Sequence, residues 1–99
     1  MTENKLFITI NHIEDYNGFS AIRPGKKMLL RKEPKNYYDE EAIAVFTEHG
    51  VQCGYVANSS HTVASGTHSA GYIHHLFPEE SSCEIRFITE EIAIAELIL

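Results

Sequence analysis

The stretch LRKEPKNYYDEEAIAVFTEHGVQCGYV, residues 30–56, decides the fold that we expect. It begins at the end of an apolar strand that Pro34 stops, because proline has no amide hydrogen to give to a strand ladder. The polar and acidic residues that follow have no period and are typical of an exposed loop. Residues 42–47 and 51–56 then form two strand-like runs, with Gly50 placed where a tight turn needs positive φ. The stretch therefore predicts a strand, a loop and a β-hairpin.

Three further strand-like segments lie outside this stretch. Near the N-terminus, Leu6, Ile8 and Ile10 alternate with residues that are themselves partly apolar, as in a strand of a closed barrel. At the other end, residues 92–99 are too apolar to be left free, so this tail must pair with the sheet or with another chain. The expected strands are residues 5–13, 26–33, 42–47, 51–56, 83–89 and 91–99, with residues 79–82 as a polar connector. So many short strands favour a small barrel, because closure removes the sheet edges.

We expect one or two short helices between the hairpin and the last strands. Residues 58–71 are rich in Ser, Thr, Gly and His, and Ser59 or Ser60 is a candidate cap for one helix. Ser69 is the candidate cap for the other, which Pro78 would stop. The 99 residues are enough for one core and too few for two, so residues 1–99 are expected to form a single domain.

Composition places the chain among soluble globular proteins. Apolar residues make up 43% and charged residues 22%, and no segment has the length of a membrane span or of a signal-peptide core. Two cysteines, Cys53 and Cys83, lie outside any CxxC pair and are interpreted as buried small hydrophobic residues of a cytoplasmic protein. The net charge of −6 means that no global positive field attracts nucleic acid, so a polyanion would have to bind at a local site.

The segment from Leu30 to Val45, with Gly54-Tyr55-Val56 after it, resembles the HIRAN domain. The family pattern is a basic residue, an acidic residue and Pro, then Asn, Tyr-Asp, Ala-Ile and Val, and nearly every anchor occurs here in register. Residues 57–71 are similar to the short stand-alone bacterial form, so the resemblance covers most of the chain. It implies an OB-like β-barrel, so together with the six strands and one or two short helices expected above we predict a mainly β fold, a small six-stranded OB-like barrel. In eukaryotic members fused to Swi/Snf-type helicases it implies binding of single-stranded DNA at a free 3′-hydroxyl end.

The pair Tyr38-Asp39 is the end-reading element that the resemblance implies. A base can stack on an exposed tyrosine ring for about 1–3 kcal/mol. The carboxylate of Asp39 only accepts hydrogen bonds, so it suits a terminal hydroxyl and repels a phosphate. The alternative interpretation is structural, with the Asp39 carboxylate bonded to backbone N–H groups of its own turn and the tyrosine packed on the barrel.

Other residues extend the candidate nucleic-acid site. Arg31 and Lys32, or Lys35, are candidates for phosphate contacts, although strand alternation sends the first two to opposite faces and a solvated surface is the plainer interpretation. The complete predicted set of nucleic-acid-binding residues is Tyr16, Arg31, Lys32, Asn36, Tyr38, Asp39, Tyr55 and Asn58.

Two departures from the family pattern weaken the expected attraction for DNA. Glu14-Asp15-Tyr16 stands where DNA-binding relatives have a basic-aromatic pair, so it keeps an aromatic ring but adds two negative charges. Asn58 stands where a basic residue would help to hold the DNA backbone. With Glu40 and Glu41 beside Asp39 as well, we expect DNA binding to be weak and sensitive to salt.

Neither a metal site nor an active site is expected. The six histidines and two cysteines form no CxxC or HExxH motif, and adjacent His74 and His75 would point about 100° apart on a helix. No phosphate-binding glycine loop, nucleophile elbow or other catalytic motif is present. We therefore expect no cofactor and no enzymatic activity.

The sequence leaves two functions open. The first is a module that binds single-stranded DNA or a free 3′-hydroxyl DNA end, in DNA repair or replication-fork processing. The second is a non-catalytic protein-interaction module that keeps the HIRAN fold without DNA binding, with self-association through the apolar C-terminal strand as one form. The sign of the charge around Tyr38 separates the two functions: Arg31, Lys32 and Lys35 favour DNA, whereas Glu14, Asp15, Glu40 and Glu41 favour a partner protein.

Overall fold

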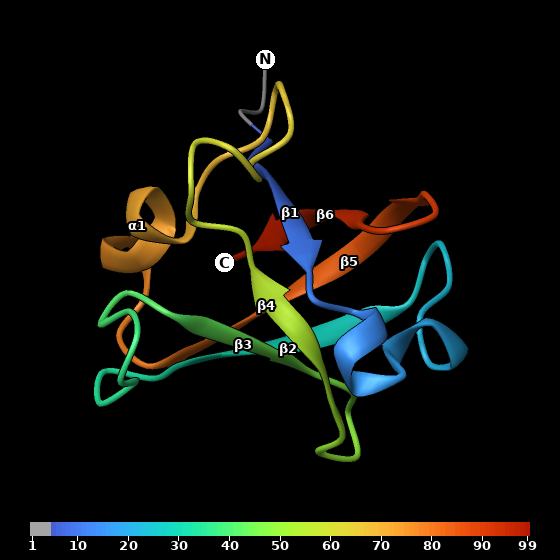
Figure 1. Ribbon diagram of the computed structural model, residues 1–99, viewed down its shortest axis with the longest axis horizontal. Coiled ribbons are helices and arrows are strands. Elements are labelled where there is room, and N and C mark those ends of the chain that lie inside the picture. The colour runs from blue at the N-terminus through green and yellow to red at the C-terminus, as the bar shows by residue number, and fades with distance from the viewer. Residues whose placement is uncertain (1–4) are drawn as a thin grey trace.

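The six strands of the protein close into an antiparallel barrel in the order β1-β4-β3-β2-β5-β6 (Figure 1). The structure, a computed structural model, describes residues 5–99. The strands are β1 (Phe7–Asn11), β2 (Lys27–Lys32), β3 (Ile43–Phe46), β4 (Gln52–Val56), β5 (Glu80–Ile88) and β6 (Ala93–Ile98). The mainly β fold and the six-stranded barrel predicted from the sequence are thereby confirmed.

The helical content is one α-helix and three 3₁₀ turns within residues 5–99. They are α1 (Ala70–Ile73), η1 (Glu14–Tyr16), η2 (Gly18–Ser20) and η3 (His74–Leu76). The Ser69 cap is confirmed, because its side chain accepts a hydrogen bond from the Tyr72 N–H. None of the helices among the described residues is long and apolar enough to cross a membrane.

The barrel interior is filled by the inward face of every strand. Along β2, Met28 and Leu30 are fully buried while the residues between and beside them are exposed, which is the period-2 pattern of a strand with one wet face. Cys53 and Cys83 also lie in this core, so their interpretation as buried small hydrophobic residues is confirmed. Burial in apolar surroundings raises the pKa of the Cys83 thiol to about 12 and raises that of Cys53 as well.

The apolar tail pairs with the sheet. β6 pairs with β5 from Ala93 to Ile98 and with β1 from Ala93 to Glu96, and the Leu97 N–H donates to the Leu6 carbonyl oxygen beyond the end of β1. An open edge at residues 93–98, the premise for self-association through this strand, is therefore not found. Within the tail, residues 92–99, Ile98 and Leu99 are the exposed large apolar residues.

The predicted connector at residues 79–82 is wrong, because β5 already begins at Glu80. Residues Glu80, Ser81 and Ser82 pair with the C-terminal half of β2. Their side chains are polar, yet a strand is formed because the backbone of β2 offers a ladder and the Arg31 Nε donates to Glu80 Oε2 at 3.0 Å. Strand formation here is thus imposed by the partner strand.

The helix expected after Ser59 or Ser60 is also absent, since the chain makes successive turns from residue 59 to residue 66. The Ser59 carbonyl accepts from the N–H groups of Thr62 and Val63, which completes a single turn. The chain is then fixed to β1, because Thr9 Oγ1 accepts from the Ala64 N–H at 3.0 Å and lies 2.8 Å from Thr67 Oγ1. These contacts with a distant strand replace the helix.

Gly54 allows the end of β1 to cross β4 closely. A Cβ atom at this position would lie 2.5 Å from the carbonyl oxygen of Asn11 and 3.2 Å from Ile10 Cγ2. The Asn11 oxygen is part of the backbone of β1, so it cannot move aside without shifting the strand. Gly54 is therefore needed for the close contact between β4 and the end of β1.

We expect Gly54→Ala to lower the free energy of unfolding by roughly 1–3 kcal/mol, because the added methyl group meets backbone. Gly71→Ala is the comparison variant: its Cβ would meet only the ends of two side chains, Glu41 Oε1 at 2.6 Å and Asn58 Oδ1 at 3.2 Å, in a helix that favours alanine. Urea unfolding of the two variants measures the difference. Equal stability of the two variants would contradict the close approach at Gly54.

Candidate functional site

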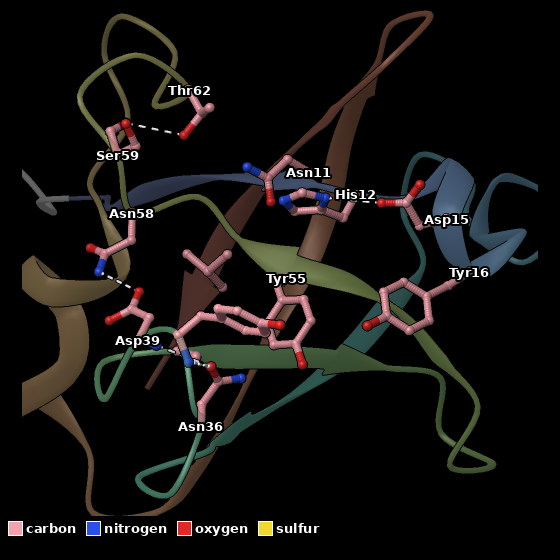
Figure 2. A pocket seen from close by; sticks show the side chains of 13 residues that line it. Asn11, His12, Asp15, Tyr16, Asn36, Asp39, Tyr55, Asn58, Ser59 and Thr62 are labelled. Atoms are coloured by element: carbon pink, nitrogen blue, oxygen red, sulfur yellow. Dashed lines mark hydrogen bonds and ion pairs between the residues drawn. The ribbon is translucent and has the colours of Figure 1, made fainter.

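A cavity of about 580 Å³ opens at one end of the barrel. Its walls come from the end of β1 and η1, from the loop between β2 and β3, and from the end of β4 with the segment after it. The lining residues are Asn11, His12, Asp15, Tyr16, Asn36, Tyr38, Asp39, Ala42, Tyr55, Val56, Asn58, Ser59 and Thr62. In Figure 2, Asp39 and Asn58 form one side of the cavity, His12, Asp15 and Tyr16 form the other, and Tyr55 lies between them.

All predicted site residues except Arg31 and Lys32 line this cavity. Arg31 lies on the outer face of β2, where its guanidinium is bonded to Glu80 and sits 5.0 Å from the centre of the Phe46 ring. Lys32 donates to the carbonyl oxygen of Phe77 and lies 4.9 Å from the centre of its ring. The two cations predicted to contact phosphate are thus engaged elsewhere on the barrel.

Asn36 shapes the loop that carries the tyrosine and the aspartate. Its side-chain oxygen accepts from the N–H groups of Tyr38 and Asp39 at 2.9 and 3.0 Å, which is an Asx-type turn. Its amide nitrogen donates to Glu33 Oε1 at 2.9 Å. An asparagine is required for this arrangement, because aspartate could accept the two N–H groups but could not donate to Glu33.

The Asp39 carboxylate is bonded within the site but not saturated. Oδ1 accepts from the Glu41 N–H at 2.9 Å, and Oδ2 accepts from the Asn58 side-chain amide at 2.9 Å. A carboxylate offers about four lone-pair positions, so each oxygen can accept a second donor from the cavity. The structural interpretation of Asp39, a carboxylate bonded to backbone N–H groups of its own turn, therefore accounts for the bond from Glu41 only. The remaining lone pairs can accept hydrogen bonds from a ligand.

The rings of Tyr37 and Tyr38 are both 91% exposed and meet edge to face, with centroids 5.1 Å apart. Neither packs on the barrel, so the second half of the structural interpretation does not hold. Of the two, only Tyr38 lines the cavity. An open aromatic surface therefore stands beside the aspartate.

Asn58 ties three segments together. Its side-chain Nδ2 donates to Asp39 Oδ2 and to Glu41 Oε1, and its side-chain Oδ1 accepts from the Gly71 N–H at 2.7 Å. The loop between β2 and β3 is thereby joined to the first turn of α1, which lies beside it in Figure 1. Because its side-chain polar atoms are bonded in this way, Asn58 positions the carboxylates of Asp39 and Glu41 and is not expected to bind a ligand directly.

Tyr16 and Tyr55 form the aromatic part of the opposite wall, with ring centroids 6.1 Å apart and planes inclined by 59°. The Tyr55 hydroxyl donates to Glu33 Oε1 at 2.8 Å, the same oxygen that Asn36 uses. Burial of the phenol, together with this bond to a carboxylate, raises the pKa of Tyr55 to about 12. Tyr55 therefore stays a neutral hydrogen-bond donor.

Sequence reasoning did not place Asn11, His12, Ser59 or Thr62 in the site, and it named Asp15 only as a charge that weakens DNA binding. His12 adopts a left-handed backbone conformation with φ of 58°, and its Nδ1 lies 3.0 Å from Asp15 Oδ2. Asn11 pairs with Tyr55 across the ladder, and its Oδ1 is buried without a hydrogen-bond partner among residues 5–99. The spacing of His12 and Asp15 was the available signal, but only barrel closure brings both to the loop between β2 and β3.

The lining of the cavity is negatively charged. Asp15 and Asp39 both border it, whereas no lysine or arginine of the described chain does. The one histidine in the lining is His12. Lys35 borders a separate small hollow with Glu33, Pro34 and Asn36. Among residues 5–99, no cluster of three acidic, histidine or cysteine side chains could hold a metal ion.

The comparisons with known proteins give one family model and two similar solved structures. The model of the HIRAN domain matches residues 6–75. The crystal structure of the HIRAN domain of human HLTF is similar to this chain with a TM-score of 0.70 and 18% identity, over 95% of this chain and 73% of that one. A crystal structure of a protein from Lactobacillus plantarum is similar with a TM-score of 0.61 and 18% identity, over 96% and 95% of the two chains. The comparison with curated proteins gave no match.

We expect the Tyr55 phenol to ionise near pH 12 in the folded protein, above its ordinary value of 10.0. Because folding favours the protonated form, this group's contribution to stability is complete below pH 10 and is lost as the pH rises towards 12. Tyrosinate absorbance of the protein and of Tyr55→Phe, titrated side by side, isolates the increment that belongs to this residue. An increment centred at pH 10 would contradict the buried bond to Glu33.

Proposed function

The chain belongs to the HIRAN family, which is known in general for DNA binding, and from that premise we propose that the cavity binds the free 3′-hydroxyl end of single-stranded DNA. The observation that supports this most is the open Tyr38 ring beside the unsaturated Asp39 carboxylate. A terminal base stacks on the ring, and the 3′-hydroxyl donates to the carboxylate. The proposal involves no catalysis, and DNA repair or replication-fork processing is its proposed setting.

The charge of the site supports recognition of an end over binding along a strand. Asp15 and Asp39 repel phosphates, and Arg31 and Lys32 lie outside the lining. Binding therefore depends on one nucleoside with few phosphate contacts. Few phosphate contacts mean modest affinity. They also mean a shallow dependence on salt, which replaces the salt sensitivity expected from the sequence, because Arg31 and Lys32 do not line the cavity.

We expect a labelled oligonucleotide ending in 3′-hydroxyl to bind about 10-fold more tightly than the same strand ending in 3′-phosphate, as expected for one hydrogen bond to a charged group. Asp39→Asn should abolish this preference, because it removes the charge that attracts a donor and repels a phosphate. Fluorescence anisotropy with both strands measures the ratio.

The chain supplies neighbouring controls for this experiment. Glu40→Gln removes the same charge next to Asp39 but outside the cavity, and should keep the preference. Tyr38→Ala should weaken binding by about 1–3 kcal/mol, whereas Tyr37→Ala changes an equally exposed ring that does not line the cavity. Equal binding of both strand ends by the unaltered protein would remove the end-recognition proposal.

A second candidate function is a protein-interaction module that uses the same cavity. The observation that favours it is the charge of the lining, which contains Asp15 and Asp39 and no lysine or arginine. The sign of this charge suits a basic segment of a protein better than a polyanion. Self-association stays a prediction without an assigned surface, because β6 is paired on both sides.

A further inference from the structure

We propose that the cavity binds the guanidinium group of an arginine side chain presented by a segment of a partner protein. This inference rests on the second candidate function and is independent of DNA binding. It follows from three properties of the cavity: its charge, its unfilled hydrogen-bond acceptors and its aromatic walls.

The charge of the cavity attracts a cation from two sides. Asp39 lies on one wall and Asp15 on the other, as Figure 2 shows. Further carboxylates stand behind these walls: Glu41 shares the Asn58 amide with Asp39, and Glu33 accepts from Tyr55. A cation between the walls therefore meets opposite charge on both sides, whereas a phosphate meets like charge.

The charged groups of the cavity, its carboxylates, keep unfilled hydrogen-bonding capacity of the acceptor kind. Each oxygen of Asp39 keeps a free lone pair after its bond to Glu41 or Asn58. Asn11 Oδ1 has no hydrogen-bond partner among residues 5–99 but is buried behind the cavity surface, so it adds a partial negative charge to the wall without contacting the ligand. The Tyr55 hydroxyl already donates its hydrogen bond to Glu33. A ligand with several N–H groups and no acceptor complements this set.

Tyrosine rings supply the remaining walls. Tyr16 and Tyr55 lie with centroids 6.1 Å apart, Tyr38 is 91% exposed, and all three border the cavity. The faces of such rings attract cations, and a planar guanidinium also stacks on them. Tyr16 is itself 37% exposed, so a ring is accessible on the Asp15 side as well.

These properties select arginine among cations. A metal ion needs converging ligands, and no cluster of three suitable side chains exists among residues 5–99. A lysine ammonium is a compact charge with three donors, whereas a guanidinium has five donors in a planar fork and serves separated acceptors. The volume of about 580 Å³ admits a whole side chain and part of its backbone.

The test is a titration of the ¹⁵N-labelled protein with the blocked peptide acetyl-Gly-Arg-Gly-amide, followed by NMR. The control peptide has citrulline in place of arginine, which keeps the shape and removes the charge. We expect saturable shifts of the side-chain amides of Asn11 and Asn58, and binding about 10-fold tighter than that of the citrulline peptide, since most of the attraction is to charge.

Variants assign the effect to the cavity. Asp39→Asn and Asp15→Asn should each weaken binding of the arginine peptide several-fold. Glu90→Gln, in the turn between β5 and β6, removes an equal charge outside the cavity and should change nothing. The dispersion of the amide spectrum checks folding, and if Asp39→Asn unfolds, Asp15→Asn decides, because asparagine can keep a hydrogen bond with His12.

Equal binding of the arginine and citrulline peptides, or shifts confined to residues outside the cavity, would overturn the inference. A lysine peptide that binds as tightly as the arginine peptide would contradict the choice of guanidinium. A single strand ending in 3′-hydroxyl is titrated separately. Binding of the peptide without binding of the strand removes the DNA proposal and keeps this one, and the opposite result removes this one alone.

Discussion

The candidate site depends on the side-chain amide of Asn58, which joins two other segments of the chain to its own. It donates to Asp39 and Glu41 in the loop between β2 and β3, and it accepts from Gly71 at the start of α1. Two carboxylates are thereby kept close to each other, although their charges repel. A longer or charged side chain at this position could not satisfy both kinds of partner at once.

The sequence predicts best what local pattern controls. Alternation of apolar residues located the strands of the barrel, and Gly50 located the turn of the hairpin. Predictions that depended on distant contacts were wrong: residues 80–82 join β5 because β2 offers them a ladder, and the turns after Ser59 are held by Thr9. The residues of these two segments do not indicate which distant strand they will contact, so their structure could not be predicted from local pattern.

The same distinction divides the site. The loop bearing Tyr38 and Asp39 was located from its own residues, since Asn36 organises it through local hydrogen bonds. Asn11 and His12 enter the cavity only because the barrel closes β1 against β4. Closure also determines the charge of the site, because it brings Asp15 to the cavity and leaves Arg31 on the outer face of β2. An acceptor-rich, aromatic pocket results, suited to a ligand that donates.

The two thiols in the barrel core have a practical consequence for studies of this protein. Cys53 and Cys83 are fully buried, and burial keeps both protonated, whereas alkylating and oxidising reagents attack the thiolate. In the folded chain both thiols are therefore protected from these reagents. Modification of either thiol therefore requires opening of the barrel, so the rate of thiol modification reports how often the barrel opens.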